Sequence, residues 1–386
     1  MHKKLRVAVL MGGASNEKET SLDSGRNVAY KLSSKKYEAI PLFVDKQMEL
    51  YPLTTRLMVH NATCEIEREL DRSTKINWHD LPTIADFVFI GLHGGLGENG
   101  AVQGALEVLK MPYNGPGVLA SSLCMDKYKT NSFLKLKGFC VPNHVLITKK
   151  EWICDKNNCL EKIKTVLQSF PLIVKPHNDG CSVFVAKITT EKQLIEHVDA
   201  LFEQTKAHAL VEEYIEGMEL TVGVVGNDVP YAFPPSQSIA FNGVLSAQEK
   251  FLPGAGENQT PAPLLDTILA TVKKTVVDAY KAVGCVGYSR IDCFYQNEKQ
   301  SKSGVARIVI LEINTLPALT PATCLFHQAA ELSITPTEFI DLIISLGLEE
   351  YYKKGMGADV AVAVGKFEKT ELSHWFSKES DEKAAT

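Results

Sequence analysis

Apolar and polar positions alternate along the first third of the chain in a way that predicts a parallel sheet flanked by helices. Three short apolar runs predict strands, at residues 6–13, 38–45 and 86–95. Between them, residues 21–34 and 101–110 carry apolar side chains at helical spacing, and Ser21 is the expected N-cap of the first helix. Strands that alternate with helices in this order pair in parallel, so function is expected in the loops that follow the strands.

From about Ser122 the pattern predicts a second, smaller α/β unit. It begins with a basic amphipathic helix over residues 125–139. Four strands and two further helices are expected after it, with the strands at 144–149, 171–176, 186–190 and 209–215 and the helices at 160–170 and 191–205.

The third part of the chain combines longer strands with helices. We expect a strand–turn–strand over 219–233, strands at 288–296 and 306–315, and helices at 264–284 and 336–347. A polar stretch from about 234 to 263 is expected to be a long functional or mobile loop. The sequence therefore predicts an α/β protein with an N-terminal parallel-sheet domain (1–121), a small central α/β domain (122–212), a C-terminal α+β domain (213–365) and a peripheral tail (366–386).

Composition and charge argue against several classes of protein. The net charge of -5 over 386 residues disfavours a nucleic-acid binder, which needs a basic surface. No apolar run is long enough to span a bilayer, so no membrane partner is expected. The 9 cysteines are scattered without metal-binding spacing, which favours reduced thiols and a cytoplasmic location. The basic and apolar N-terminus lacks a cleavage site and is interpreted as the first strand of the mature fold.

A glycine-rich motif, GLHGGLGENGAVQG at residues 91–104, joins a predicted strand to a predicted helix. Its glycines permit a tight turn whose main-chain N–H groups can approach a ligand closely. His93 and Glu98 would project into the same cleft. A short Gly-x-x-Gly alone favours a purely structural turn, but the pattern here is far longer and more specific.

Two predicted strands carry charged side chains in a regular arrangement, in the segments YSRID and LEINTLPA. Arg290 and Asp292 share one face of their strand, and Glu312 and Asn314 share one face of the next, because side chains alternate. Two acids and an amide suit Mg²⁺ beside phosphates. Arg290 would face the charge that develops at a reacting carboxyl group. Solvated charges on ordinary amphipathic strands are the alternative, but they do not explain why both strands are otherwise so apolar.

Together with the opening GGASNEKETSLDSG, these motifs resemble the D-alanine–D-alanine ligase family of the ATP-grasp superfamily, over most of residues 5–345. The resemblance implies the three-part ATP-grasp fold and an ATP-dependent ligase that joins two D-alanines through an acyl phosphate for peptidoglycan synthesis. It implies ATP and Mg²⁺ (or Mn²⁺) as cofactors and small amino acids as binding partners. A homodimer is the common assembly in the family.

The resemblance also assigns roles to individual residues. The ATP-binding residues, with the lysines at the phosphates, one acid at the adenine hinge and one near the ribose, would be Lys127, Lys175, Glu212 and Glu219. The metal ligands would be Asp292, Glu312 and Asn314. The catalytic residues would be Glu17, Arg290 and Ser182. The amino-acid substrates would contact Glu17, His93, Lys250 and Thr323.

The expected substrate pocket departs from the family pattern. Cys181 stands where the family has Ser and Phe251 where it has Tyr, two residues that the family connects to Glu17 to close a loop over the first substrate. Cys is a weak hydrogen-bond donor and Phe is none, so this latch cannot form as it does in the family. Phe184 replaces a Gly, whereas Thr323 replaces a Ser and keeps the hydroxyl.

Several interpretations therefore stay open. The substrates can be two D-alanines or another pair of amino or hydroxy acids. Glu17 can bind the ammonium of the first amino acid or stabilise the positive end of a helix. A catalytically silent ATP-binding regulator is the alternative from another class, and the complete set of lysines, acids and Arg290 argues against it. An NAD-dependent dehydrogenase is disfavoured because the first strand is not followed by G-x-G-x-x-G.

Overall fold

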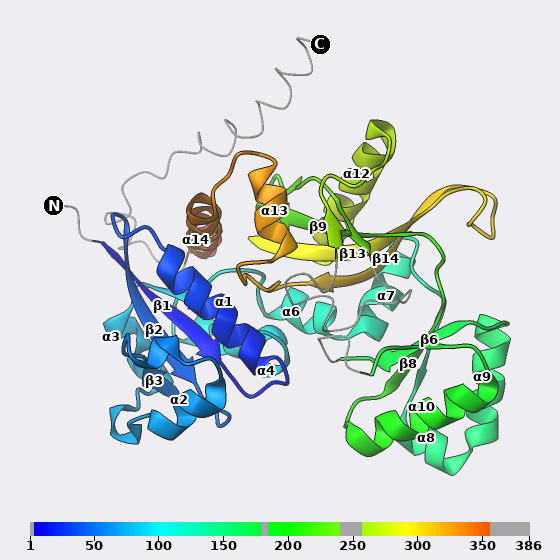
Figure 1. The fold of residues 1–386 in the computed structure, drawn as a ribbon, viewed down its shortest axis with the longest axis horizontal. Helices are drawn as coiled ribbons and strands as arrows, with labels where there is room; N and C mark the ends of the chain where they lie inside the picture. The colour runs from blue at the N-terminus through cyan, green and yellow to red at the C-terminus, as the bar shows by residue number, and fades with distance from the viewer. Residues whose placement is uncertain (1–3, 179–183, 240–256, 356–386) are drawn as a thin grey trace, which may run out of the picture.

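The computed structural model describes residues 4–178, 184–239 and 257–355, which form three sheets with helices packed around them (Figure 1). The first sheet has the order β3-β2-β1-β4, with strands β1 (Leu5–Gly12), β2 (Tyr37–Val44), β3 (Leu50–Pro52) and β4 (Phe87–Ile90). β1 is parallel to both β2 and β4, whereas the edge strand β3 is antiparallel to β2. The expected parallel sheet is confirmed, with one edge strand that the sequence pattern did not reveal.

The helices of this first part are α1 (Lys18–Lys31), α2 (Thr63–Glu69), α3 (Leu81–Ile84), α4 (Gly95–Glu98) and α5 (Ala101–Val108). Short 3-10 turns lie at Leu57–Val59, Arg72–Thr74 and Trp78–Asp80. The expectation that Ser21 caps α1 is wrong, because the helix already begins at Lys18. The Ser21 hydroxyl donates to the Glu17 carbonyl one turn earlier and accepts from the His93 N–H. Ser21 therefore joins α1 to the glycine-rich motif instead of starting the helix.

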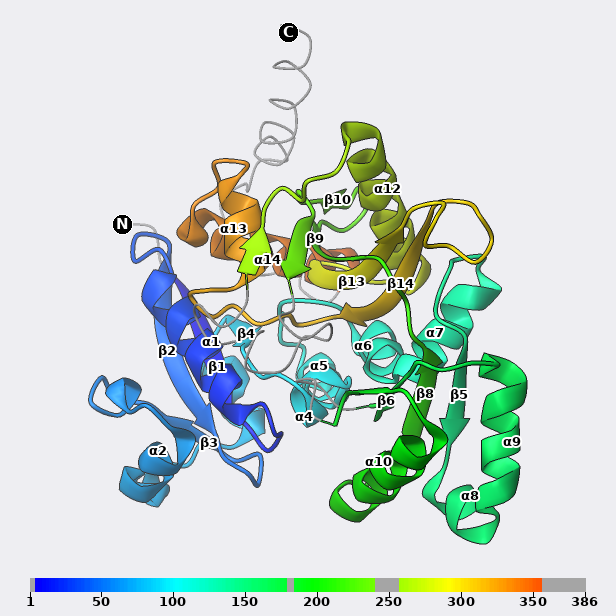
Figure 2. The ribbon, with the colours of Figure 1, turned by 45° about the vertical axis from the view of Figure 1, so that its right-hand side comes forward.

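The second sheet is fully antiparallel in the order β5-β8-β6-β7. Its strands are β5 (His144–Ile147), β6 (Leu172–Pro176), β7 (Ala186–Ile188) and β8 (Ala209–Glu213). The helices packed on it are α8 (Lys149–Cys154), α9 (Lys156–Leu167) and α10 (Glu191–Gln204), which lie together in Figure 2. All four strands and the two helices expected in this unit are confirmed, and α8 is an addition.

The third sheet has the order β12-β11-β9-β13-β14, with β10 paired to β9. Its strands are β9 (Met218–Val225), β10 (Tyr231–Ala232), β11 (Ser236–Ile239), β12 (Glu257–Gln259), β13 (Tyr288–Gln296) and β14 (Arg307–Asn314). The expected long loop at 234–263 is wrong at both ends, because β11 and β12 pair with each other there. The backbone groups of β11 and β12 form hydrogen bonds between the two strands, which the polar composition of this stretch did not predict.

Helices cover the third sheet and connect it to the first. α6 (Val118–Met125), α7 (Lys127–Leu136) and α12 (Asp266–Ala282) contact β14 and share its apolar core, whereas α13 (Cys324–Ala330) and α14 (Pro336–Lys353) share the core of the first sheet. The expected domain boundaries at 121/122 and 212/213 fall inside α6 and β8, and the division into domains stays a prediction. Among the described residues, no helix combines the length and apolar character needed to cross a membrane.

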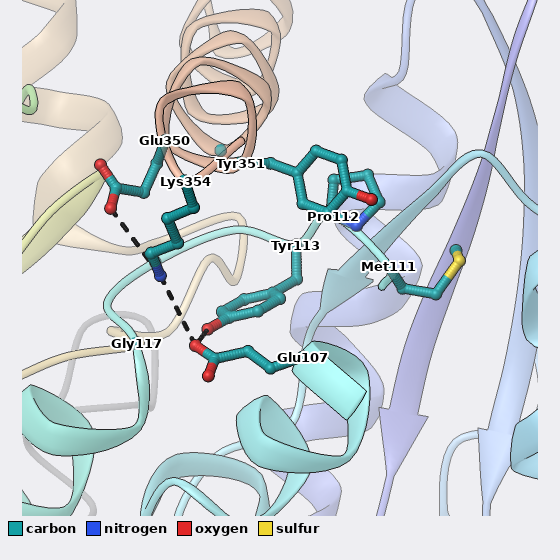
Figure 3. A pocket seen from close by; sticks show the side chains of 10 residues that line it. Glu107, Met111, Pro112, Tyr113, Gly117, Glu350, Tyr351 and Lys354 are labelled. Carbon is teal, nitrogen blue, oxygen red and sulfur yellow. Dashed lines mark hydrogen bonds and ion pairs between the residues drawn. The ribbon is translucent and has the colours of Figure 1, made fainter. Parts of the chain in front are cut away.

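Charged side chains join α14 to the first part of the chain around a small hollow (Figure 3). Lys354 Nζ lies 3.5 Å from Glu107 Oε1 and 3.7 Å from Glu350 Oε1. The Tyr113 hydroxyl donates to the same Glu107 carboxylate at 2.8 Å. Because these charges are already paired with one another and no residue expected at the active site lines the described part of this hollow, it is a structural junction.

Candidate active site

Lys127 is fixed at the first position of α7. The N-cap Asp126 accepts a hydrogen bond from the Lys129 N–H, and the Lys127 N–H donates to the His177 carbonyl at 2.8 Å, just beyond the end of β6. The Lys127 ammonium lies 3.3 Å from Glu312 Oε2. Burial opposes its charge, but the carboxylates of Glu312, Glu17 and Glu98 together raise the pKa of Lys127. A charged lysine is therefore held at the junction of the second and third sheets.

The antiparallel pair β13 and β14 brings four expected site residues together. Arg290 lies opposite Asn314, and Asp292 lies opposite Glu312. Arg290 donates two hydrogen bonds to Asp292, from Nε at 3.1 Å and from Nη2 at 3.0 Å. Burial opposes the charge of the guanidinium, but the adjacent Asp292 carboxylate raises the pKa of Arg290. The alternation seen in the sequence thus places these side chains on one face, as expected.

The Asp292 carboxylate has two further partners. The Thr221 hydroxyl on β9 donates to it at 2.6 Å, and Asn314 Nδ2 donates to it at 3.3 Å. The amide oxygen of Asn314 is then the atom that a cation can use. Two carboxylates and an amide oxygen are the hard donors that Mg²⁺ prefers, so the chemistry of the set fits this ion. In the described ranges, no group of three or more His, Cys, Asp or Glu side chains is arranged to hold a metal.

Lys175 and Glu212 form a second buried ion pair, on adjacent strands β6 and β8. Lys175 Nζ lies 2.7 Å from Glu212 Oε2, and the two side chains are 10% and 3% exposed. Asn131, one helical turn after Lys127, donates from Nδ2 to the other carboxylate oxygen at 3.2 Å. Glu219 is half-buried on β9, opposite Phe294 of β13. The four residues expected at the nucleotide therefore lie on α7, on β6 and β8 of the second sheet, and on β9 of the third sheet.

The glycine-rich motif forms a tight turn against Glu17. Gly94 has φ 64° and ψ 174°, a backbone conformation that requires glycine, and a Cβ there would lie 2.4 Å from Glu17 Oε2. Glu98 accepts hydrogen bonds from the Gly94 N–H at 3.0 Å and the Leu316 N–H at 3.3 Å. Burial raises the pKa of Glu98. Glu17 itself is buried at the start of α1, where both of its expected roles remain predictions.

His93 is buried, and both of its ring nitrogens have protein partners. Nδ1 lies 2.9 Å from the Leu316 carbonyl oxygen and Nε2 lies 2.8 Å from the Ser24 hydroxyl. Burial lowers the pKa of His93 to about 4, with a smaller contribution from the charge of Arg290. The ring is therefore neutral at neutral pH and engaged by the protein. Its expected contact with substrate remains a prediction.

The other expected site residues are placed less completely. Thr323 is the half-buried N-cap of α13 and its N–H donates to the Thr320 carbonyl. Ser182 and Lys250 lie outside the described residues, as do Cys181 and Phe251. Their expected roles stay predictions.

Three polar residues of the site were not found from the sequence: Asn131, Thr221 and Ser24. Asn131 lies four residues after Lys127 on a helix, and that spacing was a usable signal. Thr221 lies two residues after Glu219 on the same strand, so their side chains share one face, which was a weaker signal. Ser24 gave no signal, because its partners lie far away along the chain.

Comparison with known proteins agrees with this geometry. The family described as D-ala D-ala ligase N-terminus matches residues 6–116, and the one described as D-ala D-ala ligase C-terminus matches residues 133–345. The chain is 32% identical to the D-alanine–D-alanine ligase of Natranaerobius thermophilus over 363 residues, which cover 91% of this chain and 97% of the relative.

Two solved structures are similar over nearly their whole length. The VanG D-Ala:D-Ser ligase from Enterococcus faecalis superimposes with a TM-score of 0.75 at 26% identity, covering 89% of this chain and 100% of that one. The D-alanine–D-alanine ligase from Bacillus anthracis complexed with ATP superimposes with a TM-score of 0.68 at 27% identity, covering 91% of this chain and 100% of that one.

Proposed function

Because the chain belongs to the D-alanine–D-alanine ligase family, we propose that it joins two D-alanine molecules through an acyl phosphate, with ATP as the phosphoryl donor. One observation carries the proposal. The pair Arg290–Asp292 lies on β13, next to the pair that Glu312 of β14 forms with Lys127 at the start of α7, so a nucleotide and a carboxylate can meet there. The enzyme is a ligase, and its product would serve the synthesis of peptidoglycan.

In the proposed reaction, the nucleotide phosphates are held by Lys127 and Lys175. Both ammonium groups are largely buried, so their charge is weakly screened and acts strongly on phosphate oxygens. A carboxylate oxygen of the first D-alanine attacks the γ-phosphorus, ADP leaves, and an acyl phosphate forms. Glu17, next to the Gly94 turn, would hold the ammonium of this first D-alanine.

The second half of the reaction is acyl transfer. The amine of the second D-alanine attacks the acyl carbon and a tetrahedral oxyanion forms. Inorganic phosphate then leaves with the oxygen that came from the carboxylate and takes up the proton that the amine loses. Arg290 is held rigidly by Asp292 and would stabilise this oxyanion. Thr323, at the N-terminus of α13, would bind the carboxylate of the second D-alanine.

The metal ligands of the proposal are Asp292, Glu312 and Asn314, and Mg²⁺ or Mn²⁺ bound to them would neutralise charge on the phosphates. Glu312 pairs with Lys127 and Asp292 pairs with Arg290, so the charges of these four residues balance. We infer that Ser182 and Lys250 complete the catalytic and substrate-binding sets.

A second candidate function keeps the chemistry and changes the amino or hydroxy acids. Cys181 and Phe251 favour it, because they remove the hydroxyl groups with which the family closes its first-substrate pocket. The similarity to a D-Ala:D-Ser ligase is consistent with a family that accepts more than one acceptor.

Location and assembly are further parts of the proposal. The described cysteines are all free, which supports a cytoplasmic protein. A homodimer is included because it is the common assembly in the family to which the chain belongs. Light scattering coupled to gel filtration tests the assembly, and a monomeric mass would contradict it.

A phosphate-release screen tests the function. Purified protein, ATP and Mg²⁺ are combined with pairs of D- and L-amino acids and hydroxy acids, and the condensed product is identified by mass spectrometry. We expect release with D-alanine alone, because the same amino acid fills both positions. Release only with a mixed pair would favour the second candidate, and nucleotide binding without release for any pair would favour a regulator.

A further inference from the structure

The segment 315–319 joins two parts of the proposed site. It begins after Asn314, a metal ligand of the proposal, and leads to Thr323 at the start of α13. Leu316 and Leu319 in this segment are each 1% exposed. Whatever fixes this main chain also fixes the relative positions of Asn314 and Thr323.

Side chains from the N-terminal part bind the main chain of this segment at two residues. The Leu319 N–H donates to Ser24 Oγ at 3.1 Å, and the Leu319 carbonyl accepts from Asn27 Nδ2 at 2.7 Å. The Leu316 carbonyl and N–H are bound by His93 and Glu98. Because all these contacts are to backbone groups, they fix the path of the segment independently of its own side chains.

The hydrogen bonds through Ser24 and His93 form one directed chain. The Leu316 carbonyl can only accept, so His93 Nδ1 carries the ring proton. In the neutral ring Nε2 then accepts the proton of the Ser24 hydroxyl at 2.8 Å, and the Ser24 oxygen accepts from the Leu319 N–H. Ser24 is 1% exposed and His93 is 5% exposed, so bulk water does not compete for these groups.

We propose that Ser24 is a positioning residue of the amino-acid pocket, which acts through His93 and the Leu319 main chain to hold the segment between Asn314 and Thr323. The proposal rests on the proposed ligase function for its effect on substrates. Its structural part concerns the protonation and hydrogen bonding of the His93 ring, which can be measured without any reaction. Ser24 contacts His93 and main chain, so its effect on the reacting atoms is indirect.

Steady-state kinetics of three Ser24 variants and one control variant test the effect on substrates. Ser24→Ala and Ser24→Val remove the hydroxyl, Ser24→Thr keeps it, and Thr and Val have nearly the same shape. We expect the KM for the amino acid to rise about tenfold in the Ala and Val variants, with the KM for ATP unchanged and with Thr restoring most of the loss. Ser121→Ala is the control, because Ser121 is equally buried but donates to the Pro116 carbonyl elsewhere.

Several results would overturn the proposal: an unchanged amino-acid KM in Ser24→Ala, a parallel rise of the amino-acid and ATP KM values, or equal activity of the Val and Thr variants. Thermal unfolding of each variant shows whether it is folded. If Ser24→Val does not fold, the comparison of Ala with Thr decides the question.

Nitrogen-15 NMR of the histidine rings separates this proposal from the proposed function. The His93 signals are assigned by their loss in His93→Gln. We expect a neutral ring protonated at Nδ1 in the natural protein, and a shifted Nε2 resonance in Ser24→Ala but not in Ser121→Ala. A ring protonated at Nε2 would overturn the proposal even in an active ligase. If the His93 ring is in the expected state but the protein does not use D-alanine, the positioning role stands and the proposed substrate is refuted.

Discussion

Lys127 at the start of α7 and Glu312 on β14 form an ion pair of 3.3 Å, with side chains only 15% and 19% exposed. Lys127 is expected at the phosphates of the nucleotide and Glu312 at the metal ion. Each neutralises the other in the present structure, so the nucleotide and the metal ion would bind at a position where charge is already balanced. This relationship makes the charge of Glu312, and not only its size, important to the site.

We therefore expect Glu312→Gln and Asn314→Ala to reduce turnover at least a hundredfold while the protein stays folded. The lost ligand misplaces the ion, whereas the apolar core beneath β14 is untouched. Phosphate release at saturating substrates measures the loss, and circular dichroism on heating checks the fold. Near-normal phosphate release by either variant would remove that residue from the metal site.

The buried pair Lys175–Glu212 predicts that stability and ATP binding can be separated. Lys175→Met leaves Glu212 buried with a charge and no cation, which should lower the free energy of unfolding by about 3 kcal/mol. Adding Glu212→Gln removes that charge, so the double variant should recover most of the stability. Both variants should bind ATP at least tenfold more weakly, because the phosphate-facing charge is absent from each.

Urea unfolding and ATP titration measure these two properties independently. Equal stability of the single and double variants would show that the pair is not energetically coupled. Undiminished ATP affinity in Lys175→Met would place this lysine outside the phosphate site.

The neutral ring of His93 predicts a dependence of stability on pH. The pKa of His93 is about 4 in the folded protein and near 6.5 in the unfolded chain, because burial disfavours the charged ring. The unfolded chain therefore binds a proton between these pH values that the folded protein does not. The contribution of His93 falls as pH decreases from about 6.5 to 4, by about 3 kcal/mol in total.

Urea unfolding at a series of pH values, compared with His93→Gln, isolates this contribution. The difference in unfolding free energy between the two proteins should change across that window and stay level above pH 7. A constant difference from pH 4 to pH 8 would mean that His93 does not titrate as the structure indicates.

The backbone conformation of Phe184 predicts that glycine is preferred over alanine at this position. Its φ is 58°, a conformation that L-residues with a side chain adopt at a cost, and His197 Nε2 bonds its carbonyl at 2.9 Å. Phe184→Ala and Phe184→Gly both remove the ring, so they differ mainly in this backbone cost. We expect the Gly variant to be more stable than the Ala variant by about 1 kcal/mol. Chemical unfolding measures the difference, and a more stable Ala variant would show that the residue does not keep this conformation in solution.

Much of the fold follows from local sequence pattern. The strands 288–296 and 306–315 were predicted because they are long, apolar and separated by a polar turn, and alternation alone placed Arg290 beside Asp292. Short elements such as β3 and α13 were not predicted, since a few residues give no clear period. β11 and β12 were missed because their polar side chains resemble those of a loop, while their backbones are paired.

The candidate site was predictable in its residues but not in its pairings. Lys175 and Glu212 were assigned to ATP separately, yet they bind each other across β6 and β8. Ser21 resembled a helix cap because Ser often takes that position, but its hydroxyl is used by His93 on a different element. Such contacts join residues that are distant along the chain, so they depend on tertiary packing that no local pattern contains.

The transfer of carboxylate oxygen to phosphate tests the proposed function most directly. The enzyme is incubated with ATP, Mg²⁺ and D-alanine whose carboxylate oxygens are both ¹⁸O, and the inorganic phosphate is analysed by mass spectrometry. We expect one ¹⁸O atom in each phosphate released and one phosphate for each D-alanyl-D-alanine formed, because the attacking oxygen leaves with the phosphoryl group. Dipeptide accompanied by unlabelled phosphate, or no dipeptide at all, would contradict the proposed reaction.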